Sequence, residues 1–149
     1  MPNSSTYHVD AARTGWFQGA RQGASNLAAW KKIVSVNLGS AVRGAPLVLE
    51  NWTLRGGPLS GQTHDLAVVS TSSNLLNAYT LRQLYAGDTR PLWSTQLPPA
   101  SKRTGSNIPP PVGVASTPVL NESTGELHVL ALQSAGKLVS GEKIGRAHV

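Results

Sequence analysis

The sequence predicts an all-β fold. Its 15 glycines and 10 prolines together outnumber its 13 basic and 7 acidic residues combined, a balance that disfavours helical bundles and coiled coils. Short apolar or alternating segments recur between turn-rich stretches, which is typical of short strands joined by turns. The chain has 149 residues, of which 40% are hydrophobic. It is therefore long enough for about one domain with a packed core.

Residues 1–30 predict an irregular entry segment. Residues 1–24 are polar and glycine-rich, and Ser25–Trp30 can form one helical turn capped by Ser25 or Asn26. The first residues lack the basic and apolar regions of a signal peptide, so none is expected in this sequence. No run of 18 apolar residues occurs, so no transmembrane segment is expected.

Residues 31–97 predict a first group of strands. In Lys31–Leu38 the alternate residues Val34, Val36 and Leu38 are all apolar, which indicates a strand with one buried face. Further strands are expected around a loop at 55–63 and a turn at 72–74. These expected strands are Ala45–Glu50, Asp65–Ser70, Leu75–Thr80 and Pro91–Leu97.

Residues 98–112 hold five of the ten prolines and predict a stiff, exposed connector. Residues 113–143 then predict a partial second group of strands. Within it we expect strands at Ser116–Leu120 and Gly125–Leu132, a turn between them, and a further strand from Gly136.

The later part of the chain repeats the earlier part imperfectly. Gly44–Val48 and Ser116–Leu120 share the order small residue, proline, apolar residue, with Pro46 and Pro118 in corresponding places. Each is followed by a turn, a strongly apolar strand and a polar turn. A repeat of about four strands is typical of a β-propeller blade. The expected architecture is an incomplete β-propeller with about one and a half four-stranded antiparallel blades.

Several motifs in order resemble a known family. Tyr7–Gly15 resembles the "YHxDxARTG" opening of PQQ-like, quinoprotein-type β-propeller repeat proteins, and Gly113–Val129 resembles their "GITSTPVIDPxTGTLYV" segment. Val36–Leu49 and Ala78–Trp93 fit the run between these motifs, so the resemblance covers roughly residues 6–140. The residues that carry it are Tyr7, His8, Asp10, Arg13, Gly15, Pro46, Tyr79, Trp93, Thr117, Pro118 and Gly125.

The resemblance implies structural roles for these residues. The strands at Pro46 and Pro118 would line the central channel, Trp93 would pack between blades, and Asp10 with Arg13 would brace the entry segment. The family's short turn after the Tyr79 strand is replaced here by a longer stretch, which puts the docking of that blade corner in question. The resemblance also implies an extracellular or periplasmic protein.

A propeller needs about four to eight blades, so the remaining blades are expected to be missing from this sequence. The last residues, Ile144–Val149, resemble a translated sequencing adapter. Codons for these residues, followed directly by a stop codon, can be written so that they match the nucleotide sequence of a common adapter. We therefore expect the native frame to end near Glu142 or Lys143 and residues 144–149 to be a non-native tail.

The sequence contains no convincing motif for catalysis or for metal binding. The absence of cysteine excludes disulfides, thiolate zinc sites and cysteine nucleophiles. The four histidines lie at no metal-ligand spacing, and His128 is expected to be a half-buried structural residue.

Gly56–Thr63 has P-loop spacing but carries Gln62 where lysine is required, and Ser134–Lys137 matches S-x-x-K only as a common chance pattern. No catalytic, cofactor-binding or metal-ligating residue is therefore predicted; pyrroloquinoline quinone and calcium would belong only to missing parts.

The formal charge of +6 arises from a shortage of acids, and the basic residues are scattered. The tightest clusters are the pairs Lys31-Lys32 and Lys102-Arg103, so nucleic-acid binding is not expected.

Three functions remain open. The favoured one is a non-catalytic fragment of a PQQ-like propeller that binds a protein or glycan through loops 51–64 and 98–112, because rigid scaffolds with variable loops build recognition surfaces. The second is a fragment of a PQQ-dependent quinoprotein dehydrogenase, which would use the quinone over calcium. The third is a genuine small β protein that oligomerises, completing a ring by association.

Overall fold

A computed structural model describes residues 31–102, 109–133 and 138–139. The entry segment 1–30 with its expected helical turn and the expected tail 144–149 lie outside the described residues. In chain order the elements are β1 (Leu47–Thr53), β2 (Thr63–Ser70), β3 (Leu75–Thr80), α1 (Leu81–Tyr85), β4 (Trp93–Gln96), β5 (Val119–Asn121), β6 (Glu126–His128), β7 (Ala131–Leu132) and β8 (Leu138–Val139).

Strands β1 to β4 form one antiparallel sheet in sequence order. Leu47 pairs with Val68, Val68 with Ala78, and Ala78 with Trp93, so these four side chains share one face. The bounds of β3 match the expected strand, and β1, β2 and β4 overlap the expected ones. The prediction of a β fold with a four-stranded antiparallel unit is confirmed for this part of the chain.

The second group of strands is split between two small sheets. β5 pairs with β6 and β7 pairs with β8, each antiparallel. The single strand expected over Gly125–Leu132 is wrong in this respect, because the chain changes its pairing partner after β6. Burial nevertheless alternates through the break, with Val129 buried between the exposed His128 and Leu130. His128 is therefore exposed, which corrects the expectation of a half-buried histidine.

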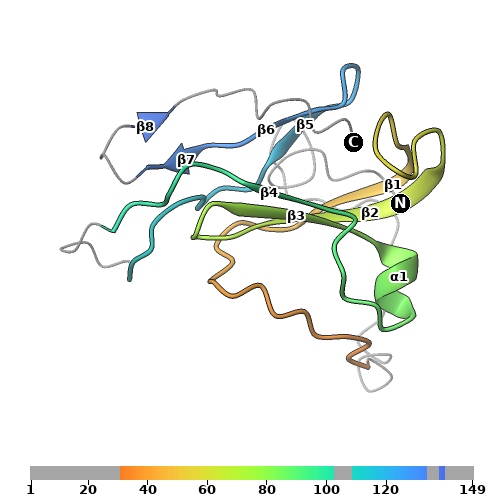
Figure 1. Cartoon of the computed structure of the whole chain (residues 1–149), viewed down its shortest axis with the longest axis horizontal. Coiled ribbons are helices and arrows are strands. Elements are labelled where there is room, and N and C mark those ends of the chain that lie inside the picture. Colours follow the sequence, from red (N-terminus) through yellow and green to blue (C-terminus); the bar gives the residue numbers. More distant parts are fainter. Residues whose placement is uncertain (1–30, 103–108, 134–137, 140–149) are drawn as a thin grey trace, which may run out of the picture.

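The β5–β6 hairpin covers one face of the four-stranded sheet (Figure 1). We call this face the first face. It contributes Leu47, Leu49, Leu66, Val68 and Ala78, which pack in one core with Leu120 and Leu127 of the hairpin. Each fully buried Leu or Val contributes about 1.5–3 kcal/mol through burial of apolar surface. The main core therefore lies between the two groups of strands.

The opposite face of the sheet is called the second face. Val48, Ala67 and Val69 lie on it and are half-buried, whereas Asn77 and Tyr79 of β3 are buried. This face is thus less completely covered over β1 and β2 than the first face.

The expected strand over Lys31–Leu38 is wrong. Its alternation is present, since Val34 and Val36 are half-buried while Ile33 is 58% exposed. Among the described residues, however, no strand pairs with it. A strand requires a partner for its backbone N–H and C=O groups, so an alternating pattern alone does not make one.

Helix α1 follows β3 directly and was not expected. Thr80 has an extended backbone and caps the helix, because its Oγ1 accepts a hydrogen bond from the Gln83 N–H at 3.2 Å and donates to Gln83 Oε1 at 2.7 Å. The helix contacts β2 and β3 at one end of the sheet (Figure 1). The longer stretch after Tyr79 thus contains a capped helix.

The expected exposed connector 98–112 is anchored at both ends. Ala100 and Ser101 are buried, and Ser101 exchanges two backbone hydrogen bonds with Val112, at 3.1 and 2.9 Å. Buried backbone groups must be paired, and these bonds join the beginning of the connector to its end. Within the described residues the sheets remain open and do not close into a ring.

Candidate functional site

The two loops expected to bind a partner lie at opposite ends of the sheet (Figure 1). Residues 54–62 connect β1 to β2 at the end where the α1 segment also leaves the sheet. The described parts of the connector, residues 98–102 and 109–112, lie at the other end, where Ser101 pairs with Val112. The two loops therefore do not form one surface. We call the end that carries residues 54–62 the loop end.

Arg55 joins the two groups of strands at the loop end. Its Nη1 donates to the carbonyl oxygen of Ser123 at 3.1 Å, and its Nη2 donates to the carbonyl oxygen of Glu122 at 3.5 Å. The guanidinium thus spans from the β1–β2 loop to the β5–β6 turn. Hydrogen bonds from a charged donor are the stronger class, and through them this exposed cation links the two loops.

The loop itself has a defined backbone. The Leu54 N–H donates to the Gln62 carbonyl at 2.9 Å, and the Gly61 N–H donates back to the Leu54 carbonyl at 2.7 Å. Gly57 and Gly61 adopt positive φ angles of 76° and 82°, which glycine accepts without steric cost. The stretch with P-loop spacing is therefore an ordered, largely exposed hairpin loop.

Trp52 lies beneath this loop. It is 9% exposed and belongs to the main core. The Arg55 guanidinium carbon lies 6.0 Å from the centroid of its ring, within the range of a cation–π interaction. The indole N–H of Trp52 is buried and has no hydrogen-bond partner among the described residues. Trp52 supports the loop end from below, because its ring faces the core.

The stretch between α1 and β4 contributes an ion pair, Asp88 with Arg90, to the loop end. Asp88 accepts from Arg90 through both carboxylate oxygens, with a shortest distance of 2.7 Å to Nη2. The hydrogen bonds from Arg90 lower the pKa of Asp88 to about 2. The same interaction raises the pKa of Arg90.

The end opposite the loop end is closely packed around Asn74. This residue is fully buried with φ of 64°, and its Nδ2 donates to the carbonyl oxygens of Pro98 at 2.7 Å and Leu132 at 3.2 Å. One amide therefore ties the β2–β3 turn to the connector and to β7. Sequence reasoning assigned Asn74 only to a turn. The signal that could have singled it out is the tolerance of asparagine for positive φ.

The two repeated proline segments lie side by side at this packed end. The Ala45 N–H donates to Thr117 Oγ1 at 3.0 Å. A Cβ atom added to Gly44 would collide with the backbone of Ser116. Pro46 is exposed, whereas Thr117 and Pro118 are buried. The segments identified as equivalent in sequence are therefore direct neighbours in space.

The other family-motif residues are dispersed. Tyr79 is buried on the second face, and this burial raises the pKa of its hydroxyl. Trp93 is half-buried and packs against both hydrophobic clusters. Gly125 has φ of 73°, and its N–H closes the β5–β6 turn onto the Asn121 carbonyl at 2.7 Å. Tyr7, His8, Asp10, Arg13 and Gly15 lie outside the described residues.

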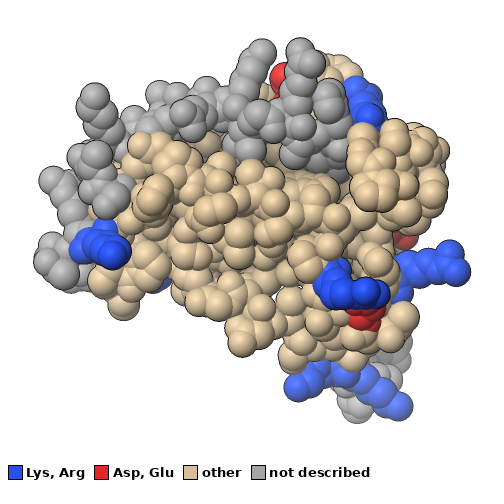
Figure 2. Space-filling model, in the orientation of Figure 1, with Lys and Arg blue, Asp and Glu red and all other residues tan. Residues whose placement is uncertain are grey.

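Charged side chains do not gather on the face shown in Figure 2, where Lys and Arg lie at the margins of a largely uncharged centre. Within the described ranges, no group of three or more His, Cys, Asp or Glu side chains is placed to hold a metal ion. No helix in the described part of the chain is long and apolar enough to cross a membrane.

Comparison with known proteins gives no relative. No family model matches the chain, and no curated protein or solved structure matches it significantly.

Proposed function

We propose that the chain contributes stacked repeat units to a β-propeller of the PQQ-like type. In this proposal it is a non-catalytic scaffold that binds a protein or glycan through its loop end. The binding surface comprises loop 54–62 and the turn 122–125.

The observation that carries the proposal is the bridge made by Arg55. Its guanidinium reaches from the first group of strands to two carbonyl oxygens of the second, Glu122 and Ser123. Loops held in a fixed relative position lose less conformational entropy on binding than free loops do. A surface built across two stacked units is thus preorganised for a ligand.

The adjacency of the repeated segments supports the scaffold part of the proposal. Gly44 packs against the backbone of Ser116, and Ala45 is hydrogen-bonded to Thr117. In repeat architectures each unit contacts only its neighbours. A direct contact between two segments that correspond in the repeat supports this arrangement.

The proposal is tested by probing arrays of glycans and of purified proteins with the full chain. The comparison variant replaces residues 55–61 with a Gly–Ser segment of equal length, which removes Arg55 and the ordered loop. We expect a specific ligand whose binding is lost in this variant. A matched control, Arg43→Ala, removes another exposed arginine, one that contacts Pro109 away from the loop end, and should bind normally.

Circular dichroism and a cooperative thermal transition establish that each variant is folded. Two outcomes would overturn the proposal. One is binding that is unchanged when the loop is replaced, and the other is no specific binding to either array.

A further inference from the structure

The repeat defines equivalent positions in the two groups of strands. Aligning Gly44–Val48 with Ser116–Leu120 makes Leu47 equivalent to Val119 and Val48 equivalent to Leu120. The strand registers extend the equivalence, because Leu47 pairs with Val68 while Val119 pairs with His128. Val68 is therefore equivalent to His128. By the same argument Ala67 is equivalent to Leu127, because Ala67 pairs with Val48 and Leu127 pairs with Leu120, the equivalent of Val48.

The two groups stack through non-equivalent faces. Leu47 and Val68 lie on the first face of the sheet and are fully buried beneath Leu120 and Leu127. The hairpin residues that cover them are the equivalents of Val48 and Ala67, which lie on the second face. The contact is thus directional: the first face of one unit receives the second face of the next.

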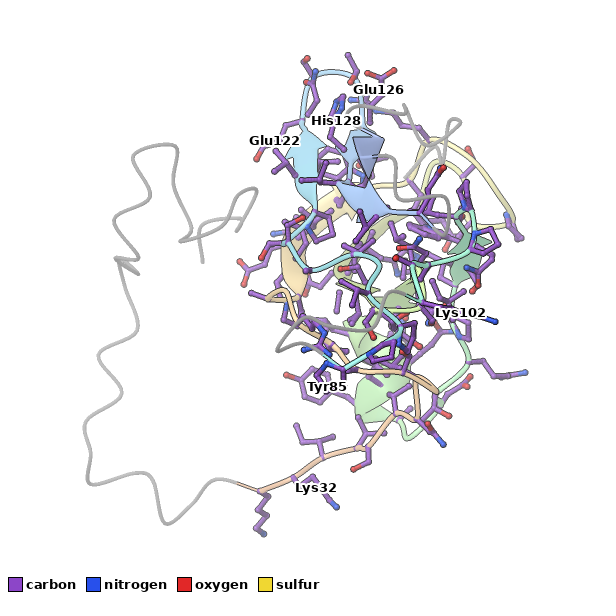
Figure 3. The ribbon with its side chains drawn as sticks, turned by 90° about the vertical axis from the view of Figure 1, so that its left-hand side faces the viewer. Lys32, Tyr85, Lys102, Glu122, Glu126 and His128 are labelled. Atoms are coloured by element: carbon purple, nitrogen blue, oxygen red, sulfur yellow. The ribbon has the colours of Figure 1, made fainter. Side chains whose placement is uncertain are left out.

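Within the part of the chain that the structure describes, this directional contact leaves one face of the β5–β6 unit exposed. We call it the distal face, and it consists of Val119, His128 and Leu130. Val119 is 40% exposed and Leu130 is 46% exposed, and His128 is also exposed. In the first unit the equivalents of Val119 and His128 are fully buried. Figure 3 shows His128 at the β5–β6 end of the molecule, away from Tyr85 and Lys32.

The complementary surface is present on the same chain. Val48 and Ala67 on the second face are half-buried, and they are the equivalents of the hairpin residues that cover the first face. The second face and the distal face lie on opposite sides of the stacked pair of units. One molecule therefore cannot bring its own second face onto its own distal face. Two molecules can do so by adding one chain to the end of another.

We propose that a second copy of this chain covers the distal face with its second face, which gives a head-to-tail association. The template is the contact between the two units within one chain. Head-to-tail contacts generate rings when the rotation closes. This inference rests on the stacking of units in the proposed function and is independent of ligand binding at the loop end.

The charge of the chain sets the salt dependence of this association. Each copy carries a formal charge of +6, so two copies repel one another at low ionic strength. The apolar part of the proposed contact, between Val119 and Leu130 on one copy and Val48 and Ala67 on the other, is not screened by salt. Raising the ionic strength should therefore tighten the association.

The first test is the mass of the full chain in solution, measured by light scattering and sedimentation velocity over a range of concentrations. We expect the mass to rise above the 15.6 kDa of one chain as concentration increases. Val119→Glu places a charge on the distal face and should weaken association at least tenfold. The matched control is Val42→Glu, because Val42 is equally exposed, at 41%, but lies outside both faces.

The second test distinguishes a head-to-tail contact from a symmetric one. Val48→Glu blocks the second face and should also give a monomer. Mixing this variant with Val119→Glu leaves one intact face of each kind, so the mixture should form a 1:1 dimer and nothing larger. If Val48→Glu loses its cooperative thermal transition, Ala67→Lys takes its place, because the long lysine side chain can turn toward solvent.

Three results would overturn the inference. They are a wild-type chain that stays monomeric at all concentrations, a Val119→Glu variant that associates like Val42→Glu, and a mixture of the two blocked variants that remains monomeric. Loop-end binding can be measured on the monomeric Val119→Glu variant. Failure of the association therefore does not affect the test of the proposed function.

Discussion

The side-chain oxygen of Asn74 occupies the space that a side chain on residue 113 would need. A Cβ atom added to Gly113 would collide with Asn74 Oδ1 and lie 2.6 Å from the Ser72 carbonyl oxygen. Asn74 itself is fully buried and hydrogen-bonded to Pro98 and Leu132. The turn between β2 and β3 is therefore fitted directly against the chain that enters the second group of strands.

Gly113→Ala should destabilise the fold by about 2–3 kcal/mol, because the added methyl group meets atoms that cannot easily move aside. The measurement is the free energy of unfolding in urea. Gly57→Ala is the control: Gly57 has φ of 76° but no atom within 4 Å of an added Cβ, so its cost is conformational, about 1–2 kcal/mol. A Gly113→Ala variant as stable as the wild type would contradict the close packing.

Asn74→Ala should cost about 3 kcal/mol. It removes two buried hydrogen bonds, each contributing about 1 kcal/mol, and leaves a residue with a Cβ atom at a positive φ angle. Asn74→Gly loses the same hydrogen bonds but accepts the backbone conformation, so it should be the less damaging change. Equal losses in the two variants would show that the backbone conformation is unimportant.

The Asn74→Gly variant also tests the contact with Gly113. Removing the Asn74 side chain relieves its own collisions with the added methyl group and leaves the one with the Ser72 carbonyl oxygen. Gly113→Ala should therefore cost less in that background than in the wild type. A double-mutant cycle measures this coupling. Additive effects would mean that the two residues do not interact.

Local sequence patterns predicted the strands of the four-stranded sheet well. Leu75–Thr80 follows the turn at 72–74 and carries Leu76, Ala78 and Tyr79 at buried positions, and it forms β3 with the expected bounds. The same reasoning failed for Lys31–Leu38, whose alternation is equally regular. The difference is the presence of a neighbouring strand, which the local sequence does not encode.

The contacts at the candidate site were beyond sequence reasoning for a similar reason. The loop containing Arg55 was expected to be a surface loop, and it is one. The carbonyl oxygens that Arg55 reaches lie in a turn 67 and 68 residues away along the chain. A backbone carbonyl has no sequence signature. Only the tertiary fold reveals that this arginine joins two units.

Thr80→Ala should destabilise the chain by about 1 kcal/mol, because it removes the oxygen that caps α1. Thr80→Ser keeps the hydroxyl and serves as the control. The effect is measured by thermal unfolding, together with amide hydrogen exchange at Gln83, whose N–H loses its partner. Unchanged exchange at Gln83 in the alanine variant would show that the cap contributes nothing.

The ion pair between Asp88 and Arg90 predicts a pH effect with a definite sign. The pKa of Asp88 is lowered from 3.8 to about 2 in the folded chain, chiefly by the hydrogen bonds from Arg90. A carboxyl group with a depressed pKa stabilises the fold above its unfolded pKa and loses that contribution as the group protonates. The contribution should therefore be complete above about pH 4 and disappear as the pH falls toward 2.

Residue-specific NMR titration of the Asp88 carboxyl carbon measures this directly. Arg90→Ala should raise the pKa of Asp88 toward the ordinary value of an aspartate, near 3.9. The rise should be incomplete, because the backbone N–H of residue 90 still donates to Asp88 Oδ1 at 3.0 Å. The control is Arg82→Ala, which removes an exposed arginine from α1 but leaves the hydrogen bonds to Asp88 in place. The free energies of unfolding of wild type and Arg90→Ala should also converge below pH 4. A pKa near 2 in the Arg90→Ala variant would assign the shift to the surrounding backbone instead of to the arginine.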